Sequence, residues 1–176
     1  MSGFDFERIH PLTDESLMNK GFFLWVWHAD KIPPHVGCSI DGKYFSLKVN
    51  GLDQCMDTKK VHSVIDQKQI LAVFIKLNQT PTYNDVKTIF LKFSKAESGK
   101  VTCLNPIIQL LAEKESITQL SELLKYLQER NNLESVFGLN LTDGYKGIRP
   151  YNSDDIENRL RLLENAKSKK YISKVG

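Results

Sequence analysis

The two-residue step Asp41-Gly42 constrains the fold of this chain more than any other feature of its sequence. Strand-like segments flank it, His35–Ile40 before and Lys43–Val49 after, and an Asp-Gly connection of this kind is a strong signal for a type I′ β-hairpin. The preceding Pro33-Pro34 pair favours an extended turn, because proline fixes its own φ and disfavours the α region for the residue before it. His35 is therefore expected to begin a strand.

The rest of the chain reads as further strands followed by helices. Phe22–His28 and Ile70–Leu77 are apolar runs without a polar face, which is typical of central strands covered on both sides. Val136–Leu141 is expected to form a late strand. Apolar spacing and end signals predict these helices: Thr58–Gln67, Asn84–Lys95, Cys103–Lys114, Ser116–Arg130 and Ser153–Lys167. This order predicts an α+β fold, in which several helices pack on an antiparallel sheet built on the N-terminal hairpin unit.

Length and composition predict one packed domain over residues 1–176. The chain is 41% hydrophobic and 26% charged, which is ordinary for a globular protein. Roughly the first 15 and the last 8 residues are expected to be flexible, as chain ends often are. The net charge is only +3, and much of the basic excess lies in the C-terminal tail. Nucleic acid is therefore not an expected partner.

Membrane insertion and secretion are not expected either. The apolar run at Gly21–Trp27 is far shorter than the about 20 residues that a membrane-spanning helix needs. The N-terminus carries acidic residues where a signal peptide would carry basic ones. Cys38, Cys55 and Cys103 show no CxxC spacing for zinc or redox chemistry, and an odd number cannot pair completely. Reduced thiols in the cytoplasm are the expectation.

Cys103 is the cysteine whose surroundings suggest reactivity. It stands beside the start of an apolar helix, and a helix N-terminus lowers the pKa of a nearby thiol. A neighbouring protonated histidine lowers that pKa further, and His35 is a candidate. Two helix starts fit the sequence: Asn105 caps a helix that begins at Pro106, or the helix begins at Thr102. In the first case Cys103 lies just outside the helix.

A family resemblance follows from these residues. His35-Val36-Gly37 at a strand start, the Asp41-Gly42 turn, Ser46 on the second strand and a later helix led by Cys103 resemble the circularly permuted NlpC-type papain-like proteins. That group includes relatives of lecithin retinol acyltransferase, and the resemblance spans residues 22–113. It implies a permuted papain-like fold and a thiol hydrolase or acyltransferase that acts on an amide or ester bond.

The resemblance also implies roles for the three site residues. Cys103 would be the nucleophile, His35 the general base and Ser46 the residue at the orienting position. Family members usually carry His, Glu, Asn or Gln where this chain has Ser46. The substrate would be a peptide or a small molecule, and no cofactor is implied.

A non-catalytic interaction domain that binds a protein partner is the alternative. Free cysteine is often a buried core residue, so Cys103 has a purely structural reading. His35 has one too, as a turn residue at the start of a strand. Ser46 at the orienting position favours this alternative, because a serine has no charge to stabilise an imidazolium.

Other polar residues are expected to serve structure. Cys38 alternates with apolar neighbours on one hairpin face and should point into the core. The histidines lack the ligand spacing of a zinc site, so no metal is expected. Asp41, Asp53 and Asp57 are expected in turns, where carboxylates usually cap the backbone.

Overall fold

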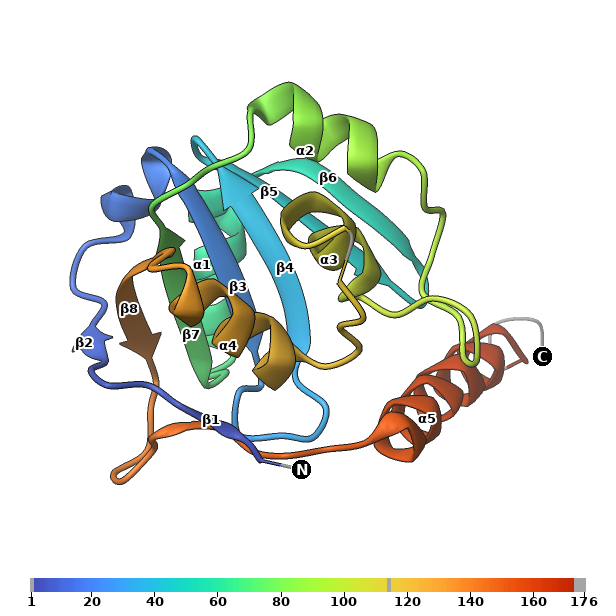
Figure 1. Cartoon of the computed structure of the whole chain (residues 1–176). Helices are drawn as coiled ribbons and strands as arrows, with labels where there is room; N and C mark the ends of the chain where they lie inside the picture. The colour runs from blue at the N-terminus through green and yellow to red at the C-terminus, as the bar shows by residue number, and fades with distance from the viewer. Residues whose placement is uncertain (1, 114, 173–176) are drawn as a thin grey trace.

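The computed structural model describes residues 2–113 and 115–172 and shows a mixed sheet with helices on both faces (Figure 1). The sheet has seven strands in the order β2-β8-β7-β3-β4-β5-β6, and β1 pairs with β9 in a separate two-stranded ribbon. The strands are β1 (Phe4–Asp5), β2 (His10–Pro11), β3 (Phe22–Trp27), β4 (His35–Ile40), β5 (Lys43–Lys48), β6 (Gly51–Asp57), β7 (Ala72–Leu77), β8 (Leu133–Leu139) and β9 (Gly147–Ile148). The helices are η1 (Glu15–Asn19), α1 (Thr58–Gln67), α2 (Tyr83–Phe90), α3 (Asn105–Leu111), α4 (Leu120–Glu129) and α5 (Ser153–Ile172).

The predicted hairpin forms as β4 and β5. Ile40 lies opposite Lys43, so the connection is the two-residue Asp41-Gly42 turn. Both turn residues have positive φ, 46° for Asp41 and 78° for Gly42, as a type I′ turn requires. The Asp41 carboxylate also accepts the Gly21 N–H at 2.9 Å, which ties the turn to the start of β3.

Both apolar runs are central strands, as predicted. β3 lies between β4 and β7, and β7 lies between β3 and β8. All these pairings are antiparallel, and only β2 pairs in parallel, with β8. The predicted α+β class and its largely antiparallel sheet are therefore confirmed.

Side chains alternate between the two sheet faces and build two cores. On one face, Trp25 and Phe74 pack with Val61 and Ile65 of α1. On the other face, the core includes strand residues such as Leu24 and side chains from α2, α3 and α4. Figure 1 shows α3 and α4 in front of the sheet and α1 behind it. Cys38 is fully buried in the core on the α3 side, as its alternation predicted.

Several helix bounds differ from the sequence prediction. α2 ends at Phe90 instead of Lys95, because the amides of Lys92 and Phe93 turn back to carbonyls three residues earlier. α3 begins at Asn105 instead of Cys103, and the predicted end at Lys114 lies outside the described residues. α4 begins at Leu120, because a capping box sets its start: the Glu122 carboxylate accepts the Gln119 N–H at 3.1 Å, and the Gln119 side chain accepts the Glu122 N–H.

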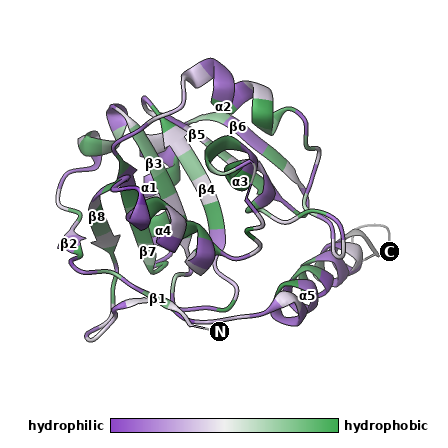
Figure 2. Ribbon diagram, viewed as in Figure 1, coloured by the Kyte–Doolittle hydropathy of each residue, from purple (hydrophilic) through white to green (hydrophobic). Residues whose placement is uncertain are grey.

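α5 stands apart from the sheet and passes the predicted end at Lys167 (Figure 1). Hydrophilic residues dominate it, in contrast to the apolar strands (Figure 2). Leu160 joins a small core with Leu47 and Ala96. Glu164 accepts the Ser98 N–H at 3.1 Å and the Ser98 hydroxyl at 3.2 Å. Among the described residues, no helix has the length and apolar character needed to cross a membrane.

Candidate functional site

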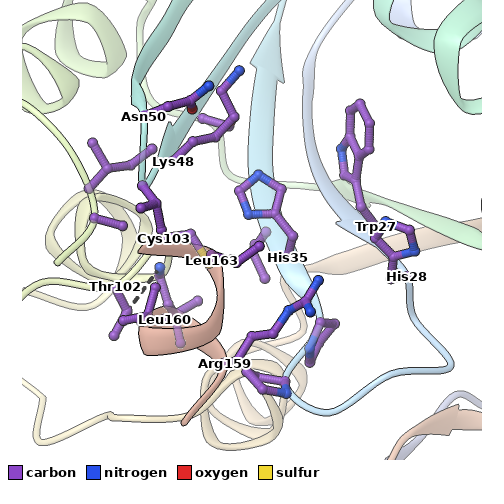
Figure 3. A pocket seen from close by; sticks show the side chains of 18 of the residues that line it. Trp27, His28, His35, Lys48, Asn50, Thr102, Cys103, Arg159, Leu160 and Leu163 are labelled. Atoms are coloured by element: carbon purple, nitrogen blue, oxygen red, sulfur yellow. Dashed lines mark hydrogen bonds between the residues drawn. The ribbon is translucent and has the colours of Figure 1, made fainter. Parts of the chain in front are cut away.

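A cavity of about 720 Å³ opens where β4 begins, and α5 forms part of its wall (Figure 3). Its lining also comes from the end of β5, from β6, from α1 and from the loop before α3. His35, Ser46 and Cys103 all line it, so the fold brings the three sequence-predicted site residues to one cavity. This volume is within the range of small-molecule sites.

His35 is the first residue of β4 and lies opposite Trp27 of β3. The two rings meet edge to face, with 6.2 Å between their centroids. Burial lowers the pKa of His35 to about 4; the charges of Lys48 and His28 act in the same direction, and the carboxylate of Asp53 opposes them. The imidazole is therefore neutral at physiological pH and has a nitrogen available to accept a proton.

Cys103 lies in the turn that leads into α3. The Thr102 N–H donates to Asn105 Oδ1 at 2.6 Å, and the Leu104 N–H donates to Thr102 Oγ1 at 3.2 Å. These bonds fix the turn and so the place of the sulfur. The structure follows neither predicted helix start, because Leu104 is the N-cap and the Asn105 side chain reaches back to Thr102 instead of capping the helix.

The Cys103 sulfur lies beside the backbone of β4. Burial raises the pKa of the thiol, while the N–H groups of Val36 and of Cys103 itself lower it. The β4–β5 ladder ends at the Gly37–Ser46 pair, so neither His35 nor Val36 has a partner on β5. The cysteine thus reaches the stretch of β4 that β5 leaves uncovered.

The two candidate catalytic side chains approach β4 from opposite faces. Val36 belongs to the core on the α3 side, so the adjacent His35 points to the α1 side, where it meets Trp27. Cys103 comes from the α3 side. Both residues line the same cavity, because the cavity passes from one face of the sheet to the other where the β4–β5 ladder ends. In the view of Figure 3, the side chain of Leu163 from α5 lies between them.

Ser46 is buried on β5, and its hydroxyl donates to Asp53 Oδ2 at 3.2 Å. The other oxygen of that carboxylate binds Lys48 Nζ at 2.8 Å. Asp53 also lines the cavity and acts electrostatically on His35. The assignment of Asp53 to a turn was wrong, because it lies in β6 and pairs with Ser46 across the ladder.

The register of the second hairpin locates Asp53, and the Asn50-Gly51 signal in the sequence would have set Ser46 opposite Cys55 instead. Lys48 pairs with Gly51, so Val49-Asn50 is another two-residue turn, and counting back along both strands sets Ser46 opposite Asp53. The other two aspartates do lie at turns or caps. Asp41 binds the Gly21 amide, and Asp57 is the N-cap of α1 and accepts the Lys59 N–H.

Position 37 requires glycine, because Tyr44 and the Phe45 carbonyl group approach its backbone closely at the cavity wall. A Cβ at this position would collide with the hydroxyl of Tyr44 and with the Phe45 carbonyl oxygen, 2.8 Å away. The missing side chain therefore lets the Tyr44 hydroxyl end lie over Gly37 of β4, with the ring 6.0 Å from that of Trp27 between centroids. Tyr44 and Trp27 both line the cavity, and sequence reasoning did not identify either as a site residue.

Comparison with known proteins gives no relative: no protein-family model, no curated protein and no solved structure matches this chain. Among the described residues, no group of three or more His, Cys, Asp or Glu side chains is placed to hold a metal ion.

Proposed function

We propose that this chain is a thiol hydrolase or acyltransferase that acts on an amide or ester bond through Cys103 and His35, within a permuted papain-like fold. One observation carries the proposal. A cysteine just before a helix and a neutral histidine at the start of a strand line one cavity of substrate size, and a backbone N–H beside the sulfur partly offsets the rise of the thiol pKa on burial.

The chemistry would follow from these residues. Because Cys103 and His35 reach the cavity from opposite faces of β4, the Leu163 side chain would first have to move from between them. The Cys103 sulfur would then bond to the substrate carbonyl carbon while the thiol proton moves to a ring nitrogen of His35. The C–N or C–O bond then breaks, the leaving group takes that proton, and an acyl thioester remains on Cys103. Water or an acceptor alcohol attacks this thioester with His35 as base, which restores the thiol.

Asp53 is the proposed positioning residue for His35. Its negative charge favours the imidazolium that forms during proton transfer, as the electrostatic effect of Asp53 on the His35 pKa indicates. Ser46 would act on the histidine through Asp53, because its hydroxyl donates to that carboxylate. The role predicted for Ser46 would thus be indirect.

Acylation by p-nitrophenyl butyrate tests the proposal. The expected result is a butyryl adduct on Cys103, located by peptide mass spectrometry and removed by hydroxylamine. His35→Gln should slow adduct formation by roughly 100-fold or more, as expected on loss of a general base. Cys55→Ser is the matched control and should change nothing, because Cys55 lies outside the cavity, bonded to the Tyr83 hydroxyl at 2.9 Å. Acylation that is unchanged in Cys103→Ala would overturn the proposal.

A non-catalytic binding domain is the second candidate, and the resting state of the pair favours it. Burial raises the pKa of the Cys103 thiol and lowers the pKa of His35, so both groups are neutral at pH 7 and no thiolate–imidazolium pair stands ready. Such a domain would bind ligand in the cavity but form no adduct on Cys103. The acylation experiment separates the two functions.

A further inference from the structure

The cavity lining is far more basic than the whole chain. Among the described residues, its charged lining residues are six cations and one carboxylate, Asp53, whereas the whole sequence has 24 Lys and Arg against 21 Asp and Glu. The cations are Lys31, Lys48, Lys60, Arg159, Lys167 and Lys170. A cleft lined by one sign of charge concentrates the field and attracts ions of the opposite sign. The cavity is therefore built to attract an anion.

The walls of the same cavity are apolar. Met56, Val64 and Leu163 line it although their side chains are 40%, 40% and 37% exposed, so water covers apolar surface here from three different elements. Leu160 and Trp27 extend this surface (Figure 3). Exposed apolar residues that face one cavity indicate a ligand with an apolar body that covers them.

Two hydrogen-bonding groups in the cavity wall lack well-aligned partners. Trp27 Nε1 and Tyr44 Oη are buried, and neither makes a hydrogen bond of normal geometry among the described residues, although the Tyr44 hydroxyl lies near Ser46 and the Trp27 indole. Tyr44 as a whole is 1% exposed. Buried polar groups in proteins are nearly always satisfied, so each unpaired group calls for an explanation. An oxygen atom of a bound ligand would accept from both, close to His35, whose ring contacts that of Trp27.

We propose that the cavity binds an anionic acyl compound: an apolar chain that carries a carboxylate or phosphate group, with the chain along Leu160, Leu163 and Val64 and the charge among Lys60, Arg159 and Lys31. Trp27 and Tyr44 would donate to an oxygen of this ligand. The inference rests on the proposed function, because it names the substrate class for the same site, and its binding test does not depend on catalysis.

Titration of the tryptophan fluorescence of the full chain tests the ligand class. Four ligands share one apolar chain and differ in the head group: octanoate, octyl phosphate, octanol and octylammonium. Octanoate and octyl phosphate should bind at least about 10-fold more tightly than octanol, and octylammonium most weakly, with the differences reduced at high salt. Trp27→Phe should remove most of the signal, which assigns it to the cavity.

Two arginines on α5 provide matched variants. Arg159 lines the cavity, whereas Arg161 does not line it and pairs with Glu157 on the same helix. Arg159→Gln should weaken octanoate binding several-fold and leave octanol binding unchanged, while Arg161→Gln should alter neither. Equal loss in both variants would show general charge attraction and overturn the assignment to the cavity.

The remaining outcomes separate this inference from the catalytic proposal. If octanol binds as tightly as octanoate while Cys103 still forms the adduct, the substrate class is wrong and the catalytic proposal stands. If the anions bind, in wild type and in Cys103→Ala alike, while no adduct forms, the ligand class stands and catalysis is wrong. Equally tight binding of acetate or inorganic phosphate would show that the apolar chain does not contribute to binding and would overturn that part of the inference.

Discussion

α4 and α5 cover the same protein in different ways. α4 has ten residues and buries Leu120, Leu123, Leu124 and Leu127 against the sheet. α5 has twenty residues, yet Leu160, at 9% exposure, is the buried residue among its described side chains, and the helix lies over a cavity instead of a core. The comparison teaches that α4 mainly stabilises the core of the fold, whereas α5 mainly forms a wall of the cavity.

The largest expected effect is a difference in stability between these helices. Leu123→Ala in α4 should lower the free energy of unfolding by about 2–5 kcal/mol, because it leaves a cavity in a fully buried site. Leu160→Ala in α5 should cost about 1–2 kcal/mol, because its core is small. Urea unfolding followed by circular dichroism measures both. Equal losses would contradict the division between the two helices.

His35 should make the cavity end of the sheet sensitive to acid. Its pKa is about 4 in the folded protein and about 6.5 in the unfolded chain, so the unfolded state binds the proton first. Stability is full above about pH 6.5 and should fall by up to about 3 kcal/mol as the pH drops to 4.

Unfolding midpoints measured between pH 7 and pH 4 test this expectation. His35→Gln should flatten the dependence, whereas the control His10→Gln, on the edge strand β2, should keep the wild-type slope. The same slope in His35→Gln and wild type would show that His35 is not the group that titrates.

The contact between Glu164 and Ser98, which holds α5 to the loop before α3, should stabilise that attachment by about 1 kcal/mol and affect the rest of the fold little. Glu164→Gln weakens two hydrogen bonds to Ser98, so α5 should separate from the loop before α3 more often. Trypsin cleavage within α5 should become faster while the urea midpoint changes little. Glu157→Gln is the control, because its carboxylate pairs with Arg161 on α5 itself. A fall in the free energy of unfolding as large as that of Leu123→Ala would show that α5 belongs to the main core.

The smallest expected change in stability comes from Leu163→Ala, below about 0.5 kcal/mol, because the side chain is already 37% exposed. The substitution should have a larger effect on how easily a reagent reaches the Cys103 sulfur, since Leu163 lies between Cys103 and His35 in the view of Figure 3. Alkylation of Cys103 by iodoacetamide should become several-fold faster. Leu162→Ala, at a 63% exposed position outside the cavity lining, should leave the rate unchanged.

The sequence predicted the parts of the fold that depend on local signals. The Asp41-Gly42 turn determined a hairpin, and the apolar character of Phe22–His28 identified a central strand, because both properties are contained in a few adjacent residues. β6 was missed. It is an edge strand with an irregular register to β5 and a residue of positive φ, Cys55, so it lacks a regular alternating pattern.

The candidate site was predictable only in its residue types. His35 and Cys103 were chosen for their chemistry, and the structure brings both to one cavity. The approach of the Val36 amide to the sulfur, the carboxylate of Asp53 and the cover by α5 depend on contacts between segments far apart in the sequence. Local patterns contain no information about such contacts. The role of Ser46 stays a prediction.

The early end of the β4–β5 ladder has a consequence for how chemistry and motion are linked. In most of a sheet, strand amides bond to neighbouring strands, but the Val36 amide lies beyond the end of the β4–β5 ladder and faces the sulfur of Cys103. A reaction that converts the neutral thiol to a thioester draws electron density from the sulfur into the carbonyl group and weakens it as a hydrogen-bond acceptor. The Val36 N–H would then be less well bonded while the acyl group is attached. Acylation of Cys103 would therefore change the backbone at the start of β4.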